Sequence, residues 1–209
     1  MNIPFELKLI DQYWLPVSES SSRDPNGCPE DTTSHGKIEL CINGQDISGC
    51  DNQDTDYGIN QSAVKLLQTV FIDHDLDKTS PLFFHGCSIL GTCPNCIIDF
   101  KVNHISDDKV VLDHFYVSGS QKGGDSMSFY DKSVCLSNIE YAKAILSFAR
   151  KALEFLPIDK KSPGLEHEVE YYKQLRIEHK ELISLVEKYL QECSISQAMK
   201  ERAASFEVV

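Results

Sequence analysis

One histidine and three cysteines lie within a dozen residues of the segment FFHGCSILGTCPNCIIDF, which begins at Phe83. Their spacing is H-x-C-x5-C-x2-C, formed by His85, Cys87, Cys93 and Cys96. Zinc prefers four tetrahedral nitrogen or sulfur ligands, and a Cys-x2-Cys turn is a common way to present two thiolates to one ion. Strand-like runs precede and follow the group, so a single corner of a sheet would collect all four side chains. The pattern therefore predicts a structural zinc site.

Other interpretations of the same residues stay open. A partial metal site completed by Cys50 or His104 is one, and buried free thiols, which pack as small apolar groups, are another. The CPNC motif also resembles the Cys-Pro-x-Cys of thioredoxin-like proteins, in which the first cysteine lies at a helix N-terminus. Here the β-branched run IIDFKV follows the motif. This run is typical of a strand and argues against redox catalysis.

A cysteine nucleophile is the strongest enzymatic alternative, with Cys87 as the attacking thiolate of a hydrolase or transferase. Such a thiolate needs a base and a group that orients the base. In this hypothesis the base is His104 or His114, on a predicted neighbouring hairpin, and Asp99 or Asp113 orients it. The sequence contains these residue types but does not place them together.

A His-Asp pair also occurs in FIDHDLD, at His74 and Asp75. A metal-dependent phosphohydrolase would need further histidines upstream on helices, and only His35 precedes this pair, in a polar stretch. We interpret the pair as the solvated end of a helix.

The charge of the chain restricts the partners that it can bind. Lys and Arg number 20 against 32 Asp and Glu, so the net charge is −12 near pH 7. Such a chain repels phosphate backbones and anionic lipid, which argues against nucleic acid or membrane as a partner and favours a basic protein. The chain contains no basic leader and no run of about 20 apolar residues, so we expect a cytoplasmic protein. Its eight cysteines are then thiols or metal ligands rather than disulfides.

Period-2 alternation of apolar residues predicts the strands that would position these side chains. The predicted strands span residues 5–9, 37–43, 81–86, 96–105 and 109–118. The turn SDD joins the last two into an antiparallel hairpin. The Gly- and Ser-rich stretch SGSQKGGDSMS after them predicts a loop.

Helical spacing predicts three longer helices. The first has Asn60 as its N-cap and carries its apolar face up to Phe71. Ser137 and Glu140 match a capping box at the start of the second. The third spans about 163–193, begins with a proline in its first turn, and has a tyrosine-rich apolar side.

The order strand, strand, helix, strands, helix, helix predicts an α+β fold, in which helices pack on an antiparallel sheet of about five strands. Residues 1–160 would form the core domain, with polar loops near 18–36 and 43–58. Residues 161–209 would form a C-terminal helical segment that packs on the core or extends from it. The aromatic side of this segment offers a surface for a homodimer, and packing on the parent sheet is the alternative.

Four segments, INQSAVKLLQTVFIDHD, PLFFHGC, CIIDFKVNH and EYAKAILSFARKA, together resemble a set of bacterial proteins of uncharacterised activity. The resemblance covers about residues 37–156. It implies a bacterial origin and identifies no catalytic residue.

The acidic charge, the long polar loops and the lack of a complete catalytic signature favour one class of function. We expect an acidic cytoplasmic binding protein, such as an inhibitor or immunity-type partner of a basic protein, with a structural zinc corner. The Cys87 enzyme is the alternative.

Overall fold

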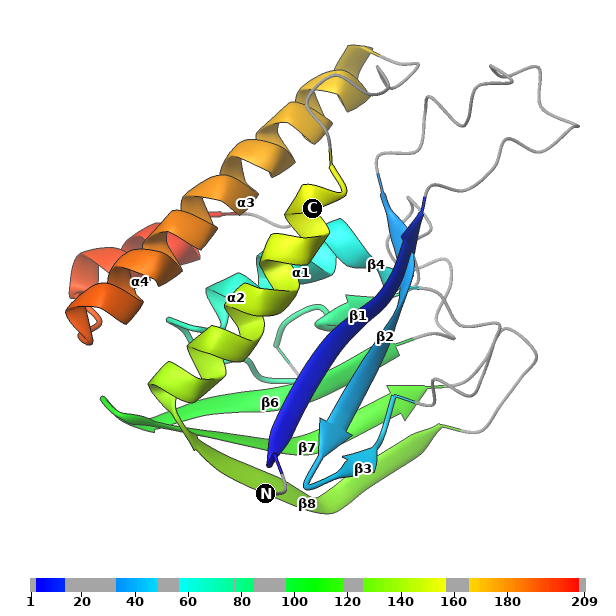
Figure 1. The fold of residues 1–209 in the computed structure, drawn as a ribbon, viewed down its shortest axis with the longest axis vertical. Coiled ribbons are helices and arrows are strands. Elements are labelled where there is room, and N and C mark those ends of the chain that lie inside the picture. Colours follow the sequence, from blue (N-terminus) through cyan, green and yellow to red (C-terminus); the bar gives the residue numbers. More distant parts are fainter. Residues whose placement is uncertain are drawn as a thin grey trace, which may run out of the picture.

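Residues 3–13, 33–48, 57–76, 78–84, 97–118, 126–156 and 166–206 are described by the computed structural model of the chain (Figure 1). The elements, in chain order, are β1 (Phe5–Tyr13), β2 (His35–Ile42), β3 (Gln45–Asp46), β4 (Tyr57–Gly58), α1 (Ile59–Gln68), β5 (Phe83–Phe84), β6 (Ile97–Ser106), β7 (Lys109–Ser118), β8 (Met127–Ser137), α2 (Asn138–Glu154), α3 (Glu166–Glu192) and α4 (Gln197–Ala204). The strands of this part of the chain form two antiparallel four-stranded sheets. The predicted α+β class is confirmed, with the strands divided between two sheets.

The first sheet has the strand order β1-β2-β3, and β4 pairs with the start of β2. Alternate residues of β1 and β2 are buried, such as Phe5 and Leu40, as the period-2 pattern predicted. Strand β2 begins at His35, two residues before its predicted start. Gly36 permits this pairing, because a Cβ atom there would lie 2.2 Å from the carbonyl oxygen of Asp11 in β1. The two predicted polar loops therefore overlap strands of this sheet. The loop predicted near 18–36 includes the first residues of β2, and the loop predicted near 43–58 includes β3 and β4.

The second sheet has the strand order β5-β6-β7-β8. The predicted hairpin is confirmed, with Asp107 and Asp108 as the turn between β6 and β7. Strand β8 was not predicted: its first two residues belong to the predicted loop SGSQKGGDSMS, its last residue to the predicted capping box, and residues 129–136 were assigned to no element. It is an edge strand, and its buried residues are Val134 and Leu136 near its end. An edge strand that is exposed over most of its length shows no apolar alternation.

Helix α1 lies at the centre of the core. It begins at Ile59, with Gly58 as N-cap, and not after the predicted N-cap Asn60. Asn60 is buried instead, and its Oδ1 accepts the backbone N–H of Ser34 at 3.0 Å. All residues of α1 from Ile59 to Leu67 are buried. The helix is therefore enclosed by the sheets and by the other helices.

Helix α2 packs against α1 and β1 (Figure 1). Its predicted capping box is confirmed. Ser137 Oγ accepts the backbone N–H of Glu140 at 3.1 Å, and the Glu140 carboxylate accepts the backbone N–H of Ser137 at 3.0 Å. These two bonds satisfy donors at the helix start that have no partner within the helix.

Helix α3 packs on α1 and α2, and α3 and α4 together form the outer layer (Figure 1). Helix α3 ends before Cys193, which has φ 54°. The ring of Tyr189 in α3 packs edge-to-face on Phe71, with ring centroids 6.2 Å apart. Gln68 Nε2 at the end of α1 donates to the carbonyl oxygen of Phe206 at 2.7 Å and so holds the end of α4. Among the described helices, none has the length and apolar character needed to cross a membrane.

Candidate functional site

The predicted zinc ligands lie outside the described residues. His85, Cys87, Cys93 and Cys96 fall between β5 and β6, within residues 85–96, and Cys50 falls within residues 49–56. The zinc site and the Cys87 nucleophile therefore stay predictions.

The two predicted partners of Cys87 on β6 contact different residues. His104 Nδ1 lies 2.9 Å from Asp73 Oδ1, and the same oxygen accepts the backbone N–H of His104 at 2.8 Å. Asp99 Oδ1 instead lies 2.8 Å from Nε2 of His74. The structure therefore does not join His104 to Asp99. Each forms a His–Asp pair with the segment after α1.

The other predicted base and orienting group come together on β7. His114 Nδ1 lies 2.6 Å from Asp113 Oδ1, and the His114 side chain is about half exposed. Neighbouring residues of a regular strand point to opposite faces. A β-bulge between Asp113 and Phe115, where His114 has φ 54°, permits the contact. This pair lies at the surface.

His74 is a buried residue, and the interpretation of FIDHDLD as a solvated helix end is wrong. Helix α1 ends at Gln68, and His74 then pairs with Val102 of β6 as an isolated bridge. Its backbone N–H donates to the Val102 carbonyl at 2.9 Å, and its carbonyl accepts the Val102 N–H at 3.0 Å. We call residues 73–76 and 78–82, between α1 and β5, the α1–β5 connection. The bridge attaches this connection to the second sheet.

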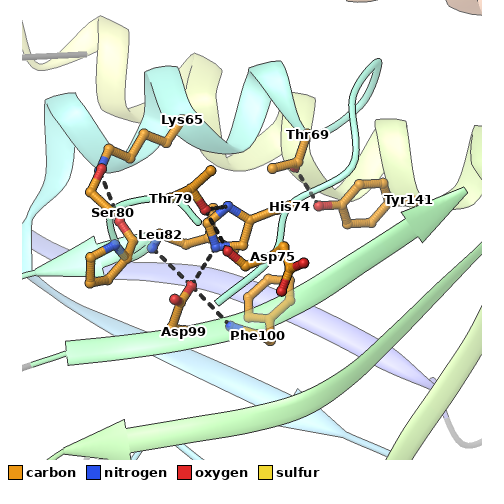
Figure 2. A network of polar contacts seen from close by, with 11 residues as sticks. Lys65, Thr69, His74, Asp75, Thr79, Ser80, Leu82, Asp99, Phe100 and Tyr141 are labelled. Atoms are coloured by element: carbon orange, nitrogen blue, oxygen red, sulfur yellow. Dashed lines mark hydrogen bonds and ion pairs between the residues drawn. The ribbon is translucent and has the colours of Figure 1, made fainter. Parts of the chain in front are cut away.

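Asp99 is the main acceptor of the α1–β5 connection (Figure 2). Its side chain is 6% exposed, and the side chain of His74 is 7% exposed. Asp99 Oδ1 accepts from His74 Nε2 at 2.8 Å and from the backbone N–H groups of Leu82 and Phe100, each at 3.1 Å. Bonds to a charged acceptor are the stronger kind of hydrogen bond. One carboxylate therefore fixes two points of the connection to β6.

Thr79 completes the hydrogen bonding of the His74 ring. Thr79 Oγ1 donates its single proton to the carbonyl oxygen of Asp75 at 2.9 Å, and it lies 2.8 Å from His74 Nδ1. Nδ1 of the ring faces Thr79 and Nε2 faces Asp99, so both ring nitrogens have a hydrogen-bond partner. These two contacts fix the orientation of the buried ring.

Lys65 of α1 reaches the same connection from the other side (Figure 2). Its ammonium donates to the hydroxyl of Ser80 and to the carbonyl oxygen of Pro81, the latter at 3.0 Å. It also lies 4.8 Å from the centre of the Phe84 ring. Burial lowers the pKa of the Lys65 ammonium to about 8, and the Asp99 carboxylate partly opposes this effect.

A pocket of about 170 Å³ lies beside these groups, and we call it the Lys65 pocket. Its lining comprises Lys65, Gln68, Thr69, Ile72, Asp73, His74, Thr79, Ser80 and Leu82. At its inner end Thr69 donates to the Leu66 carbonyl, so the phenol of Tyr141 donates to Thr69, at 2.6 Å. Burial raises the pKa of Tyr141, which keeps the phenol a neutral donor. The lining residues thus come from α1, from the turn that follows it and from the α1–β5 connection.

Sequence reasoning missed this site almost completely. Lys65 lies in an amphipathic helix that also contains Asn60, Gln61, Ser62 and Gln68, so its position is typical of a solvated lysine. The sequence therefore gives no signal that Lys65 is buried. It gives none for Ser80 either, which lies in a polar stretch.

A second cluster lies on the first sheet, and we call it the carboxylate face: Glu6, Lys8, Glu39, Cys41 and Asp46. The Lys8 ammonium is 3.0 Å from the Glu6 carboxylate and 2.8 Å from that of Glu39. Cys41 Sγ lies 3.6 Å from the same Glu39 oxygen, and Asp46 is opposite Cys41 in the strand register. Two carboxylates therefore contact one ammonium group, and a third acidic residue lies on the same sheet.

These carboxylates make the face electrostatically negative. Hydrogen bonds to Glu39 and Glu6 raise the pKa of Lys8. Burial is the largest cause that raises the pKa of the Cys41 thiol to about 11, and Glu39 is the next. Ligand atoms of Glu6, Glu39 and Cys41 lie within 4.8 Å of one another, the one such group among the described residues. A soft metal needs the thiolate form of cysteine, which this environment disfavours, so the face suits an ammonium or guanidinium group better.

Comparison of the chain with models of protein families, with curated proteins and with solved structures finds no match. The bacterial resemblance over residues 37–156 therefore stays a prediction.

Proposed function

We propose that this protein is a bacterial, cytoplasmic binding protein whose partner is a basic protein, which it inhibits as an immunity-type protein does. The observation that carries the proposal is the carboxylate face, where the carboxylates of Glu6 and Glu39 both bind the ammonium group of Lys8. Lysine and arginine side chains of a basic partner present the same chemistry. A chain with a net charge of −12 also attracts such a partner over a distance.

Four acidic residues of α3 are less available for this role. Carboxylates of α3 pair with cations of the same chain: Glu170 with Lys173, Glu181 with Arg202, Glu187 with Arg150, and Glu192 with Lys188. Each of these pairs cancels its own charge. On the carboxylate face, by comparison, a single lysine lies between the carboxylates of Glu6 and Glu39, which leaves an excess of negative charge that attracts a basic partner.

The test is capture of partners from an extract of the native host by immobilised protein. We expect wild-type protein to retain a basic protein at low salt and to release it at about 1 M salt, where charges more than about 3 Å apart are screened. A triple variant, Glu6→Gln with Glu39→Gln and Asp46→Asn, should lose the partner at low salt.

The matched control is Glu170→Gln with Glu192→Gln and Glu201→Gln, which removes the same three charges from exposed positions on α3 and α4. It should retain the partner. Equal capture by both triple variants would contradict the assignment to the carboxylate face. A wild-type protein that captures no basic protein at either salt concentration would contradict the proposed function itself.

A structural zinc corner at His85, Cys87, Cys93 and Cys96 remains part of the proposal. We expect purified protein to carry about one equivalent of zinc, since four such ligands form a closed structural site. The double variant Cys93→Ser with Cys96→Ser should lose the metal and unfold at a lower temperature. Elemental analysis and a melting curve check both points, and an unchanged melting curve would instead support buried free thiols.

A homodimer through α3 is a further proposal. Tyr172 and Tyr189, which suggested it, are both buried within the chain. Among the α3 side chains that the structure describes, Ile177 is a large apolar one that is exposed, at 50%. Sedimentation of Ile177→Asp beside the wild type tests the dimer, which should dissociate in the variant.

A further inference from the structure

We propose that Lys65 and Ser80 form a serine–lysine pair that transfers short acyl groups from esters or amides, an activity separate from the binding function proposed above. Three features of the geometry carry the proposal. The Lys65 amine and the Ser80 hydroxyl are in direct hydrogen-bond contact, Ser80 is exposed, and both residues line the Lys65 pocket.

The surroundings of Lys65 suit a general base. A lysine can accept a proton from serine only when its amine is uncharged near neutral pH. Lys65 is 7% exposed and lies over the Phe84 ring, and its burial lowers the pKa to about 8. More of the Lys65 amine is therefore uncharged near neutral pH than in an ordinary lysine. The Pro81 carbonyl accepts from Nζ at 3.0 Å, and Nζ also contacts the Ser80 hydroxyl, so an uncharged Lys65 amine can accept the serine proton.

Ser80 is held on both sides by the buried network. Before it, Thr79 is fixed by its contacts with the His74 ring and the Asp75 carbonyl. After it, the Leu82 backbone N–H is bound by Asp99. His74 and Asp99 are thus positioning residues, which fix the nucleophile without touching the substrate. Figure 2 shows these contacts converging from α1 and β6 on the short segment that carries the serine.

The backbone also supplies a donor for the reaction. Within the described residues, the Ser80 backbone N–H takes part in no hydrogen bond. The N–H group of a nucleophilic residue is well placed to stabilise the negative oxygen that forms when its own side chain attacks a carbonyl.

The reaction has two steps. Ser80 Oγ attacks the carbonyl carbon while its proton passes to the Lys65 amine. The C–O or C–N bond to the leaving group then breaks, and the Lys65 ammonium returns the proton to the departing oxygen or nitrogen. In the second step water gives a proton to Lys65 and attacks the acyl ester of Ser80. The carboxylic acid leaves, and the proton returns to Ser80 Oγ.

The size of the pocket limits the acyl group. A volume of about 170 Å³ is smaller than the sites that take drug-sized ligands. Its apolar walls are Ile72 and Leu82, so a short aliphatic acyl chain fits better than a charged or aromatic one.

The experiment uses p-nitrophenyl acetate as the probe. Release of p-nitrophenol is followed with time, and the protein is then quenched in acid and mapped by peptide mass spectrometry. We expect a burst and one acetyl group on Ser80. The rate of acetylation should rise with pH and level off above about pH 8, as the Lys65 amine loses its proton. Acetyl groups confined to surface lysines would overturn the proposal.

Variants separate the chemistry from the fold. Ser80→Ala should show no burst, and Ser126→Ala, which changes another exposed serine, should behave as the wild type. Lys65→Arg keeps a cation beside Ser80 but removes the base, so the burst rate should fall by about 100-fold or more. A Lys65→Arg rate equal to that of the wild type would contradict the pair. If Lys65→Arg fails to fold, the wild-type pH profile and the mapped site of acetylation decide the question.

Discussion

Two acid–base pairs with the same 2.8 Å separation lie in different surroundings, one in each sheet. His74 and Asp99 are enclosed between the α1–β5 connection and β6, with side-chain exposures of 7% and 6%. Lys8 and Glu39 bridge β1 and β2 on the carboxylate face, with exposures of 43% and 27%. The two distances are equal, but only the second pair has side chains that are substantially exposed to solvent.

The difference decides what each pair does. Water and salt screen an exposed pair, which contributes little to folding and keeps its charge available to other molecules. A buried pair is enclosed by fixed hydrogen bonds, and the loss of one partner leaves a buried polar group without a hydrogen-bond partner. We therefore assign a positioning role to His74 and Asp99, and a role in recognition to the face that contains Glu39.

The largest expected effect comes from Asp99→Ala, which removes the acceptor of His74, Leu82 and Phe100 together. The free energy of unfolding should fall by about 3–5 kcal/mol, because three buried groups lose their common acceptor, at about 1–3 kcal/mol each. Urea unfolding followed by circular dichroism measures this loss. Asp99→Asn, which keeps an acceptor for the two backbone N–H groups, should lose less. A loss for Asp99→Ala as small as that of a surface substitution would remove the distinction between the two pairs.

His179 in α3 sharpens the comparison, because this buried imidazole has the cation Arg176 as a neighbour in place of a carboxylate. Burial lowers the pKa of His179 from 6.5 to about 4. The unfolded chain then binds more protons than the folded one between these two pH values. Stability should therefore be complete above pH 6.5 and fall as the pH drops towards 4, by roughly 3 kcal/mol.

Unfolding by urea at a series of pH values checks this prediction against His179→Leu. The variant lacks the titrating group, so its pH dependence over this range should be weaker than that of the wild type. Parallel curves for the two proteins would mean that other groups cause the loss of stability in acid.

The smallest effect is expected from Glu39→Gln on the carboxylate face. Lys8 keeps Glu6 as a partner at 3.0 Å, and both groups remain hydrated. The urea midpoint should stay within error of the wild type, at low and at high salt. A decrease similar to that of Asp99→Ala would show that the carboxylate face holds the fold together.

The elements that the sequence predicted well are those whose apolar pattern is local. Strands β6 and β7 alternate clearly and are joined by a short turn, and the capping box of α2 lies within four residues. Strand β8 was missed because its outer position leaves most of its side chains in water, where alternation is not required. Helix α1 was placed correctly, but Asn60 bonds to Ser34 across the fold instead of capping the helix.

The buried network could not be predicted for a related reason. His74 and Asp99 are 25 residues apart, and their contact depends on the isolated bridge between His74 and Val102. Neither residue type is unusual where it stands, so the pair becomes visible only when β6 and the α1–β5 connection are placed side by side. The carboxylate face likewise depends on the register of β1 and β2, which brings Lys8 opposite Glu39.

The most direct test of the central claim, that Asp99 fixes the α1–β5 connection, is the hydrogen exchange of the Leu82 amide. This N–H donates to the buried Asp99 carboxylate at 3.1 Å. We predict slow exchange in the wild type, close to that of neighbouring β6 amides, and a large acceleration in Asp99→Ala. Fast exchange of Leu82 in the wild type, at the rate of an open loop, would contradict the account.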